Sequence, residues 1–254
     1  MNCFSLQGKV ALITGAGRGI GKALAIGLAE AGADVVCLAR TPDEIERTAD
    51  EARTLGRRAL AVTADVTQRE QVERAVTAAL DTFSHIDILI NNAGMNIRTP
   101  ALEVTEQNWD TVVDTNLRGP FFVAQAVGRA MCKNGYGRII NISSVGGATA
   151  LRTGVAYGAS KAGLFHMTRI LALEWAKHGV TVNAIGPWYF KTSLTEKLLE
   201  NEAYMAEILA RTPLKRVGDV EELVGPCVFL ASAASSYVTG QCLMVDGGMT
   251  IYGF

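Results

Sequence analysis

A tyrosine and a lysine stand four residues apart in the stretch YGASK, at Tyr157 and Lys161. Residues 155–177 read as a long helix, on which this spacing places both side chains on one face. A phenol normally titrates near ~10, and a neighbouring ammonium group lowers this pKa by favouring the phenolate. Tyr157 could then protonate a carbonyl during reduction or deprotonate an alcohol during oxidation. By itself the pair is more often a tyrosine and a lysine on a surface helix.

A second candidate is the stretch TGAGRGIGKA at residues 14–23, which holds four glycines. A nucleoside-triphosphatase loop would need a glycine at Ala16 and a hydroxyl residue at Ala23, so this class is excluded. The common dinucleotide pattern G-x-G-x-x-G also fails, because counting from Gly15 its last position is Ile20.

The pattern that fits is T-G-x-x-x-G-x-G, formed by Thr14, Gly15, Gly19 and Gly21. Gly15 allows a tight turn after a strand, and Gly19 lets the chain approach a pyrophosphate at the N-terminus of the following helix. Alone, the loop is equally compatible with an ordinary glycine-rich turn.

The elements that must position these groups alternate along the chain. Seven runs rich in aliphatic and β-branched residues are predicted as strands: 9–14, 34–39, 58–63, 86–91, 138–142, 181–185 and 241–245. Their continuous hydrophobicity is typical of a parallel sheet covered on both faces. Helices are expected between them, with starts at Thr41-Pro42, Thr67 and Thr105. We therefore predict an α/β fold, a doubly wound Rossmann-type sheet forming one domain over residues 1–254.

Composition narrows the possible partners. The chain has 254 residues, 49% hydrophobic and 19% charged, with a formal net charge of −1. Nothing in this balance attracts nucleic acid or an anionic membrane, and no signal peptide or membrane-spanning run is evident. The five cysteines are scattered and odd in number, which favours reduced thiols in the cytoplasm and argues against a metal site.

Further motifs follow in a fixed order: NNAG at 91–94, Asn116 in DTNLRG, NISS at 141–144, and then the tyrosine and lysine. Together they resemble the short-chain dehydrogenase/reductase family over essentially the whole chain, through the closing VTGQCLMVDGG. The family's catalytic serine precedes its tyrosine by thirteen residues, which selects Ser144 over Ser143. The resemblance thus implies the catalytic residues Asn116, Ser144, Tyr157 and Lys161.

The resemblance also implies a role for each of these groups. Ser144 would position the substrate oxygen, and Tyr157 would be the acid or base. Lys161 would hold the nicotinamide ribose and tune Tyr157, while Asn116 would anchor a water that links Lys161 to solvent. The expected cofactor contacts are Gly15, Arg18, Gly19, Ile20, Gly21, Arg40, Asp65, Val66, Asn92, Ala93, Gly94, Tyr157, Lys161, Pro187 and Thr192.

The cofactor form is expected to be NADP. Family members that use NAD carry an acidic residue at the end of the second strand, where this chain has Ala39 followed by Arg40. Arg40 and Arg18 suit a 2′-phosphate. In the alternative interpretation Arg40 stacks on adenine and NAD binds.

The substrate end departs from the family pattern, because Trp188 follows Pro187 where a glycine is usual. Its ring is expected to make the mouth of the site narrower and more aromatic. The segments NIR and PWYFKT resemble those of gluconate 5-dehydrogenase and tropinone-reductase-type members, and Arg98 could pair with a sugar-acid carboxylate. Equally, Arg98 could be a solvated loop residue. The candidate substrate residues are Asn96, Arg98, Trp188 and Tyr189.

Two other functions stay open, a 3-oxoacyl-acyl-carrier-protein reductase and a non-catalytic NADP-binding sensor. A sensor would be expected to lack the tyrosine or the lysine, and both are present. A serine hydrolase is disfavoured, since GASKA at 158–162 lacks the last glycine of G-x-S-x-G.

The predicted helices before and at the YGASK motif are apolar over more of their circumference than a sheet-facing stripe requires. The residues concerned are Phe121, Phe122, Val123, Ala126, Val127, Ala130 and Met131, then Leu164, Phe165, Met167, Ile170, Leu171, Leu173 and Trp175. We therefore expect a homo-oligomer, specifically a homotetramer. In the alternative, residues 192–211 cover these faces; by resemblance, though, a segment at roughly 188–215 closes over the substrate.

Overall fold

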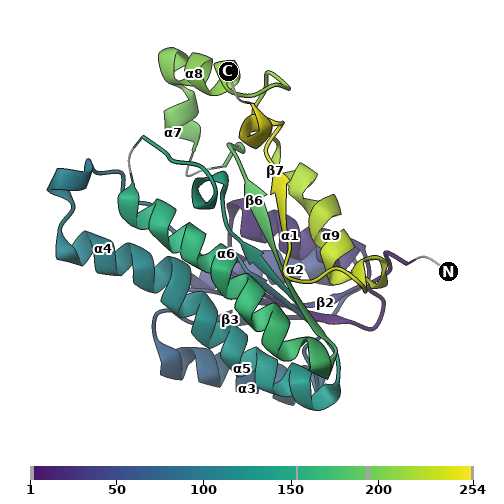
Figure 1. Ribbon diagram of the computed structural model, residues 1–254. Coiled ribbons are helices and arrows are strands. Elements are labelled where there is room, and N and C mark those ends of the chain that lie inside the picture. Colours follow the sequence, from purple (N-terminus) through teal and green to yellow (C-terminus); the bar gives the residue numbers. More distant parts are fainter. Residues whose placement is uncertain (1–2, 153, 193–194, 253–254) are drawn as a thin grey trace.

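Seven parallel strands form one sheet in the computed structural model, which describes residues 3–152, 154–192 and 195–252 (Figure 1). The strand order is β3-β2-β1-β4-β5-β6-β7. The strands are β1 Val10–Thr14, β2 Asp34–Ala39, β3 Ala59–Thr63, β4 Ile88–Asn91, β5 Gly137–Ile142, β6 Val180–Pro187 and β7 Cys242–Val245. All seven predicted strands are confirmed, with the same bounds for β2 and with bounds that differ by at most two residues for the others. The Rossmann-type fold class is confirmed with them.

Helices cover both faces of this sheet (Figure 1). They are α1 Gly19–Glu30, α2 Pro42–Thr54, α3 Arg69–Phe83, α4 Glu106–Val113, α5 Gly119–Asn134, α6 Val155–Trp175, α7 Glu196–Leu199, α8 Glu202–Ala210 and α9 Val224–Ala231. One buried cluster joins α1, α2 and α9 to the sheet, and a second cluster joins α3, α5 and α6 to the opposite face. Strands buried on both faces explain why the runs are continuously apolar.

Two expected helix ends differ from those in the structure. Thr67 does not cap α3, whose N-cap is Gln68; the Thr67 hydroxyl instead donates to Asp65 Oδ1 at 2.8 Å, within the turn after β3. The helix that carries Tyr157 ends at Trp175, and the chain tightens into a 3-10 turn over Ala176–His178. Thr105 does cap α4, since its side chain accepts from Asn108 N at 3.1 Å.

The strand order reverses between β1 and β4, which are hydrogen-bonded neighbours. Successive strands from β1 run toward one edge of the sheet, and those from β4 run toward the other. The connecting loops therefore diverge at the carboxyl ends of β1 and β4, the place where doubly wound sheets bind ligands. This topology brings the glycine loop and the NNAG motif together.

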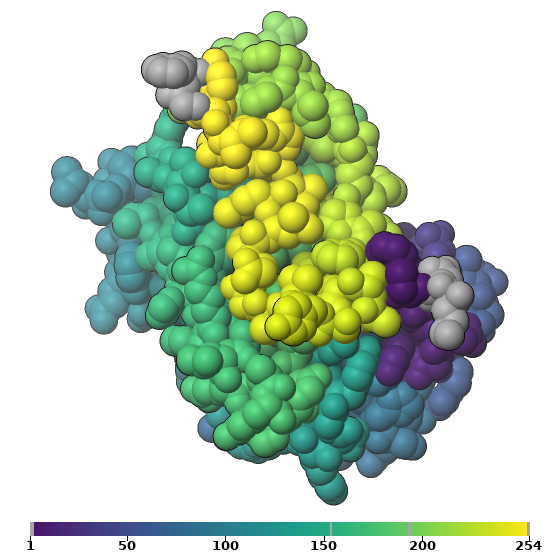
Figure 2. All heavy atoms as spheres, turned by 45° about the vertical axis from the view of Figure 1, so that its right-hand side comes forward, coloured from purple at the N-terminus to yellow at the C-terminus, as the bar shows by residue number. Residues whose placement is uncertain are grey.

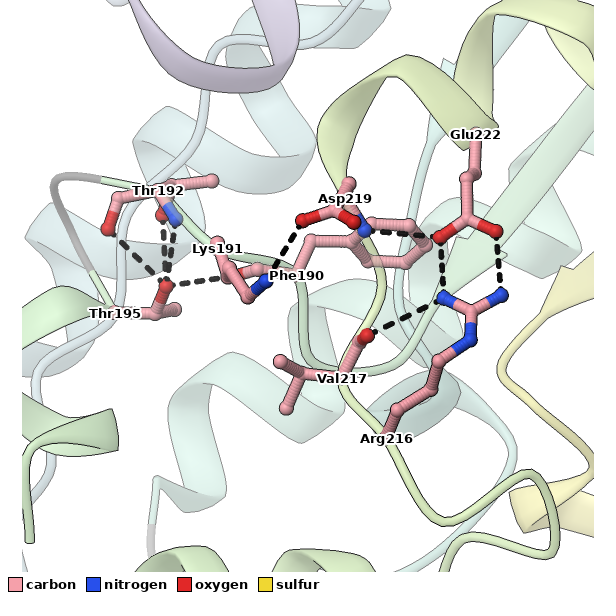
Figure 3. Close-up of polar contacts among 8 residues, drawn as sticks. All are labelled: Phe190, Lys191, Thr192, Thr195, Arg216, Val217, Asp219 and Glu222. Carbon is pink, nitrogen blue, oxygen red and sulfur yellow. Dashed lines mark hydrogen bonds and ion pairs between the residues drawn. The ribbon is translucent and has the colours of Figure 1, made fainter.

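Residues 188–215 leave the end of β6 and carry α7 and α8 above the carboxyl edge of the sheet (Figure 1). The two ends of this segment are joined at its base (Figure 3). Phe190 and Gly218 form an isolated parallel bridge, and Lys191 Nζ lies 3.0 Å from Asp219 Oδ1. Arg216 forms two hydrogen bonds with the Glu222 carboxylate, both 2.6 Å. The base is thereby fixed, while the tip depends on other contacts.

Among the described residues, no helix has the length and apolar character needed to cross a membrane.

Candidate active site

A cavity of about 600 Å³ opens at the carboxyl ends of the central strands. It is lined from the glycine loop, the ends of β2 to β6, α6 and the start of the segment 188–215. Every cofactor and substrate residue expected from the sequence lines it, and so do Ser144, Tyr157 and Lys161. Asn116 lies behind the wall, fully buried. The sequence-predicted residues are therefore gathered around one space.

The glycine loop is held against the end of β4 by Asn92. Its amide nitrogen donates to Thr14 O at 2.9 Å and to Gly15 O at 3.3 Å. Gly15 has a positive φ of 67°, and a Cβ on Gly21 would lie 2.1 Å from Gly15 O. A side chain at Gly21 is excluded, because the first turn of α1 packs directly on the loop.

The N-terminus of α1 fits the pyrophosphate of a dinucleotide. Arg18 at its N-cap makes no side-chain capping hydrogen bond, and the first turn holds no acidic residue. Backbone N–H groups and the positive end of the helix dipole are thus available to an anion. Thr192 lies across the cavity, with its Cβ 3.7 Å from where a Cβ on Gly19 would stand.

Two arginines line the far end of the cavity, each facing a carboxylate. Arg40 lies 3.8 Å from Asp65, and Arg18 lies 3.9 Å from Glu44. Arg40 is largely exposed, and Ala39 at the end of β2 brings no carboxylate to this end. Glu44 was not predicted from the sequence as a site residue. An acidic residue in the first turn of a helix is common and does not by itself indicate a binding site.

Asn116 sits in a single π-helical turn, Asp114–Arg118, between α4 and α5. Its side chain exchanges two hydrogen bonds with the backbone of Met95, both 2.8 Å, and donates to Ser160 Oγ at 3.2 Å. A Cβ built on Gly94 would lie 3.2 Å from Asn116 Oδ1 and 3.4 Å from Lys161 Nζ. The two polar groups therefore flank Gly94. The expected role of Asn116 in holding a water stays a prediction.

Lys161 and Tyr157 lie side by side on α6, as their spacing predicted. Lys161 is buried, and its Nζ donates to Ile142 O at 2.9 Å and lies 5.7 Å from the centroid of the Tyr157 ring. Burial lowers the pKa of Lys161 to about 8, because an ammonium group loses its hydration there.

The expected direction of the tyrosine pKa is wrong for this structure. Burial raises the pKa of Tyr157, while a hydrogen bond to Ser144 and the charge of Arg98 lower it by less. The cost of removing a phenolate from water is thus larger than the stabilisation of the phenolate by Ser144 and Arg98. The position of Lys161 beside the phenol follows from the sequence, whereas the burial of the phenol does not.

Arg98 lies at the substrate end of the cavity, against two tyrosines. Its guanidinium donates to Tyr204 Oη at 3.0 Å and to Tyr189 Oη at 3.4 Å. Arg98 is nevertheless exposed, so the alternative that it is a solvated loop residue stays open beside its two tyrosine contacts. Tyr204 was not predicted, since it lies on α8 and is brought to Arg98 only by folding.

Trp188 is fixed in the wall of the cavity by two contacts. Its Nε1 donates to Thr212 Oγ1 at 3.0 Å, and its ring packs edge-on against Tyr189 with centroids 4.5 Å apart. It lines the cavity wall together with Tyr189, which agrees with an aromatic mouth. Asn96 also lines the cavity, and its buried Oδ1 has no hydrogen-bond partner among the described residues.

Comparison with known proteins agrees with this geometry. A family model described as enoyl-(acyl carrier protein) reductase matches residues 15–250. The chain is 45% identical to gluconate 5-dehydrogenase of Gluconobacter oxydans (strain 621H), over 98% of this chain and 97% of that protein. It is 40% identical to a tropinone reductase homolog of Arabidopsis thaliana, over 99% and 96% of the two chains.

Among solved structures, a gluconate 5-dehydrogenase from Burkholderia cenocepacia J2315, in complex with NADP and tartrate, superposes with a TM-score of 0.96. The two chains are 42% identical, and the match covers 99% of this chain and 98% of that one. The resemblance drawn from the motifs is confirmed: this chain belongs to the short-chain dehydrogenase/reductase family, whose members are NAD(P)-dependent oxidoreductases.

Proposed function

We propose that this oxidoreductase transfers a hydride between NADP(H) and the carbonyl or secondary alcohol of a sugar acid, of the gluconate and ketogluconate kind. The observation that carries the substrate class is Arg98. Among the described residues no carboxylate lies within ion-pairing distance of it, whereas Arg18 and Arg40 each face one. A guanidinium in a cavity with only hydroxyl partners suits a carboxylate ligand.

Arg98 also lines the same cavity as Ser144 and Tyr157, so one ligand in that cavity could reach all three. The charge of Arg98 lowers the pKa of Tyr157, though by less than burial raises it. A substrate whose carboxylate meets Arg98 would therefore present another of its carbons to Tyr157. The relatives named above are gluconate 5-dehydrogenases, which supports a sugar acid as the substrate.

The chain's own residues would handle the proton. Tyr157 and Ser144, which line the same cavity, would both bind the carbonyl oxygen, and Tyr157 would give it a proton. The ammonium group of Lys161 would favour the phenolate left behind. Bound NADPH would supply the hydride to the carbonyl carbon.

The NADP form is supported by Arg40 and Arg18 at the far end of the cavity and by Ala39 in place of an acidic residue. A 2′-phosphate could replace the distant carboxylates that these arginines now face. NAD is the alternative, with Arg40 stacked on the adenine.

A homotetramer is part of the proposal. Leu173 on α6 is 84% exposed and Ile170 is also exposed, so residues 195–211 do not cover this face in the chain. A second apolar region lies at the last strand, with Leu243, Ile251 and Tyr252 exposed. Figure 2 shows the C-terminal segment, in yellow, on the surface. Two such regions would give two pairing interfaces. All five cysteines are free, which supports the expected cytoplasmic location.

The substrate class is tested with a panel of ketones at fixed NADPH: 5-keto-D-gluconate, neutral cyclic ketones and a β-ketoacyl thioester. We expect kcat/KM to be highest for the sugar acid. Replacing Arg98 with Met should lower kcat/KM for the sugar acid by about tenfold to a hundredfold, from the loss of a charged hydrogen bond, and change the neutral ketones far less. Preference for the thioester would favour the acyl-carrier-protein alternative, and no turnover on any ketone would favour the sensor.

A further inference from the structure

Three side chains from distant parts of the chain meet at the substrate end of the cavity. Arg98 comes from the loop after β4, Tyr189 from the start of the segment 188–215, and Tyr204 from α8 within that segment. The two hydroxyl oxygens lie 2.5 Å apart, and the two rings meet edge-on with centroids 6.0 Å apart. The body of the enzyme and the tip of the segment are thus joined through one guanidinium.

Among the described residues, few other polar contacts hold the tip of this segment. Its base is fixed by the Phe190 and Gly218 bridge and by the ion pair between Lys191 and Asp219 (Figure 3). At the tip, α8 is tied to the body by an ion pair between Arg152 and Glu207, whose side chains are 69% and 49% exposed. Exposed ion pairs of this kind contribute little to stability, because water and salt screen them. The contact between Arg98 and Tyr204 is therefore a main polar link between α8 and the cavity.

The hydrogen bonds of this group leave donors unused. Arg98 donates to both tyrosine oxygens, and one of the two hydroxyl protons lies between those oxygens. The other hydroxyl proton has no acceptor among the described residues. Burial, with the hydrogen bond to Tyr204, raises the pKa of Tyr189 to about 12, so the Tyr189 phenol keeps its proton at physiological pH. One O–H and the remaining guanidinium N–H groups can thus be offered to a ligand.

A carboxylate accepts hydrogen bonds from several donors at once, so it could accept from both the tyrosine O–H and the guanidinium N–H groups. We propose that Tyr204 is a positioning residue that couples the binding of the substrate carboxylate at Arg98 to the closed position of the segment 188–215. The inference rests on the proposed function, because it requires an anionic substrate. Its consequence is specificity: a substrate with a carboxylate closes the segment, and a neutral ketone does not.

The first test compares steady-state kinetics of the wild type with Tyr204→Phe, which removes one hydroxyl from a half-buried ring. We expect KM for 5-keto-D-gluconate to rise about tenfold, the loss of one hydrogen bond to a charged group, with kcat nearly unchanged. KM for a neutral cyclic ketone should not move. Tyr237→Phe is the matched control, since Tyr237 is fully exposed. An equal loss on both substrates would make Tyr204 merely structural and overturn the inference.

A second readout follows the segment itself. Lys197, Arg211 and Lys215 are exposed within it and are sites for trypsin. We expect the non-reacting complex with NADP⁺ and 5-keto-D-gluconate to slow cleavage there in the wild type and in Tyr237→Phe, but not in Tyr204→Phe. NADP⁺ with a neutral ketone should give no added protection over NADP⁺ alone. Equal protection of Tyr204→Phe would contradict the coupling.

The two proposals can fail separately. If the wild type does not prefer the sugar acid, the proposed function is wrong and the coupling falls with it. If the preference exists and is lost in Arg98→Met, while Tyr204→Phe keeps both its KM and its protection, the proposed function stands and the coupling alone is wrong.

Discussion

Tyr157 and Lys161 share one wall of the cavity, and burial favours the neutral form of each side chain. It raises the pKa of the tyrosine and lowers that of the lysine to about 8. A protonated phenol is the form needed to give a proton to a carbonyl, so the raised pKa of Tyr157 suits reduction. Below about pH 8 the phenol is neutral while Lys161 still carries its positive charge, which can favour the phenolate that forms when the proton leaves.

The proton donor is tested by Tyr157→Phe. We expect kcat for ketone reduction to fall by about 10²–10⁴-fold, because one acid or base group contributes that much. NADPH binding, followed by fluorescence, should change little and serves as the control for folding. Turnover near the wild-type rate would show that another group supplies the proton.

The buried lysine makes stability depend on pH. The folded chain releases the Lys161 proton near pH 8 and the unfolded chain only near 10.5, so unfolding takes up a proton between these values. The free energy of unfolding contributed by Lys161 is most favourable above about pH 10.5 and falls as the pH drops to about 8. Lys161→Met removes this dependence, which amounts to about 3 kcal/mol at most.

Urea unfolding of the wild type and of Lys161→Met at pH 7.5 and pH 9.5 checks this. At pH 7.5 the free energy of unfolding of the variant should rise relative to that of the wild type. This difference between the two proteins should shrink at pH 9.5. Other groups that titrate in this range are common to both proteins and cancel. A difference that is the same at both pH values would contradict the buried, shifted lysine.

Cofactor choice is also decided by single residues. Arg40→Asp, with Ala39 unchanged, replaces attraction for a 2′-phosphate by repulsion, and we expect the preference to reverse from NADP to NAD. Dissociation constants for both cofactors, measured by calorimetry, give the ratio directly. The prediction is wrong if the wild type binds the two cofactors equally well.

At the scale of elements, the site depends on how closely α1 packs on the glycine loop. The amide of Asn92 at the end of β4 holds the loop from one side, and Gly21 lets the helix approach from the other. This packing brings the free N–H groups at the start of α1 into the cavity. The anion site is thus a property of two strands and a helix together.

Gly21→Ala tests this packing. The new Cβ would lie 2.1 Å from Gly15 O and 2.4 Å from the Asn92 amide nitrogen, so the backbone must shift. We expect a loss of about 1–3 kcal/mol in the free energy of unfolding, with weakened NADP binding. Gly225→Ala is the matched control, since it adds the same methyl group to α9 with no atom within 4 Å. Wild-type stability and binding in Gly21→Ala would refute the argument.

At the scale of the whole molecule, the described chain leaves the α6 face and the region of β7 uncovered. Aliphatic surface of this kind gains about 25 cal/mol per Å² when it is removed from water, so pairing of copies is favoured. Association would also hold the helix that carries Tyr157 and Lys161.

Light scattering should give a mass four times that of the 27.0 kDa chain. Leu173→Asp should dissociate the α6 interface, because it places a carboxylate within an apolar contact. Leu102→Asp is the control, since Leu102 is fully exposed before α4 and outside both proposed interfaces. A wild-type monomer at micromolar concentration would refute the oligomer, and a stable dimer would leave only one interface.

The sequence by itself determined whatever depends on near neighbours along the chain. Continuous apolar runs predict buried strands, and the glycine spacing predicts the turn into α1. The four-residue step from Tyr157 to Lys161 places both on one helical face, because a helix repeats every 3.6 residues. The fixed order of the motifs then indicates the family, and with it the fold and the reaction class.

Only the tertiary structure decided what depends on packing between distant segments. Tyr204 contacts Arg98, which lies 106 residues away along the chain, and Asn92 contacts the glycine loop, which lies 78 residues away. No periodic pattern in the sequence predicts either contact. The direction of the Tyr157 pKa is set by burial, which comes from the elements folded around it and not from Lys161 four residues away. Spacing fixes which groups can be neighbours within one element, whereas folding sets their hydration and their partners from other elements, and so their chemistry.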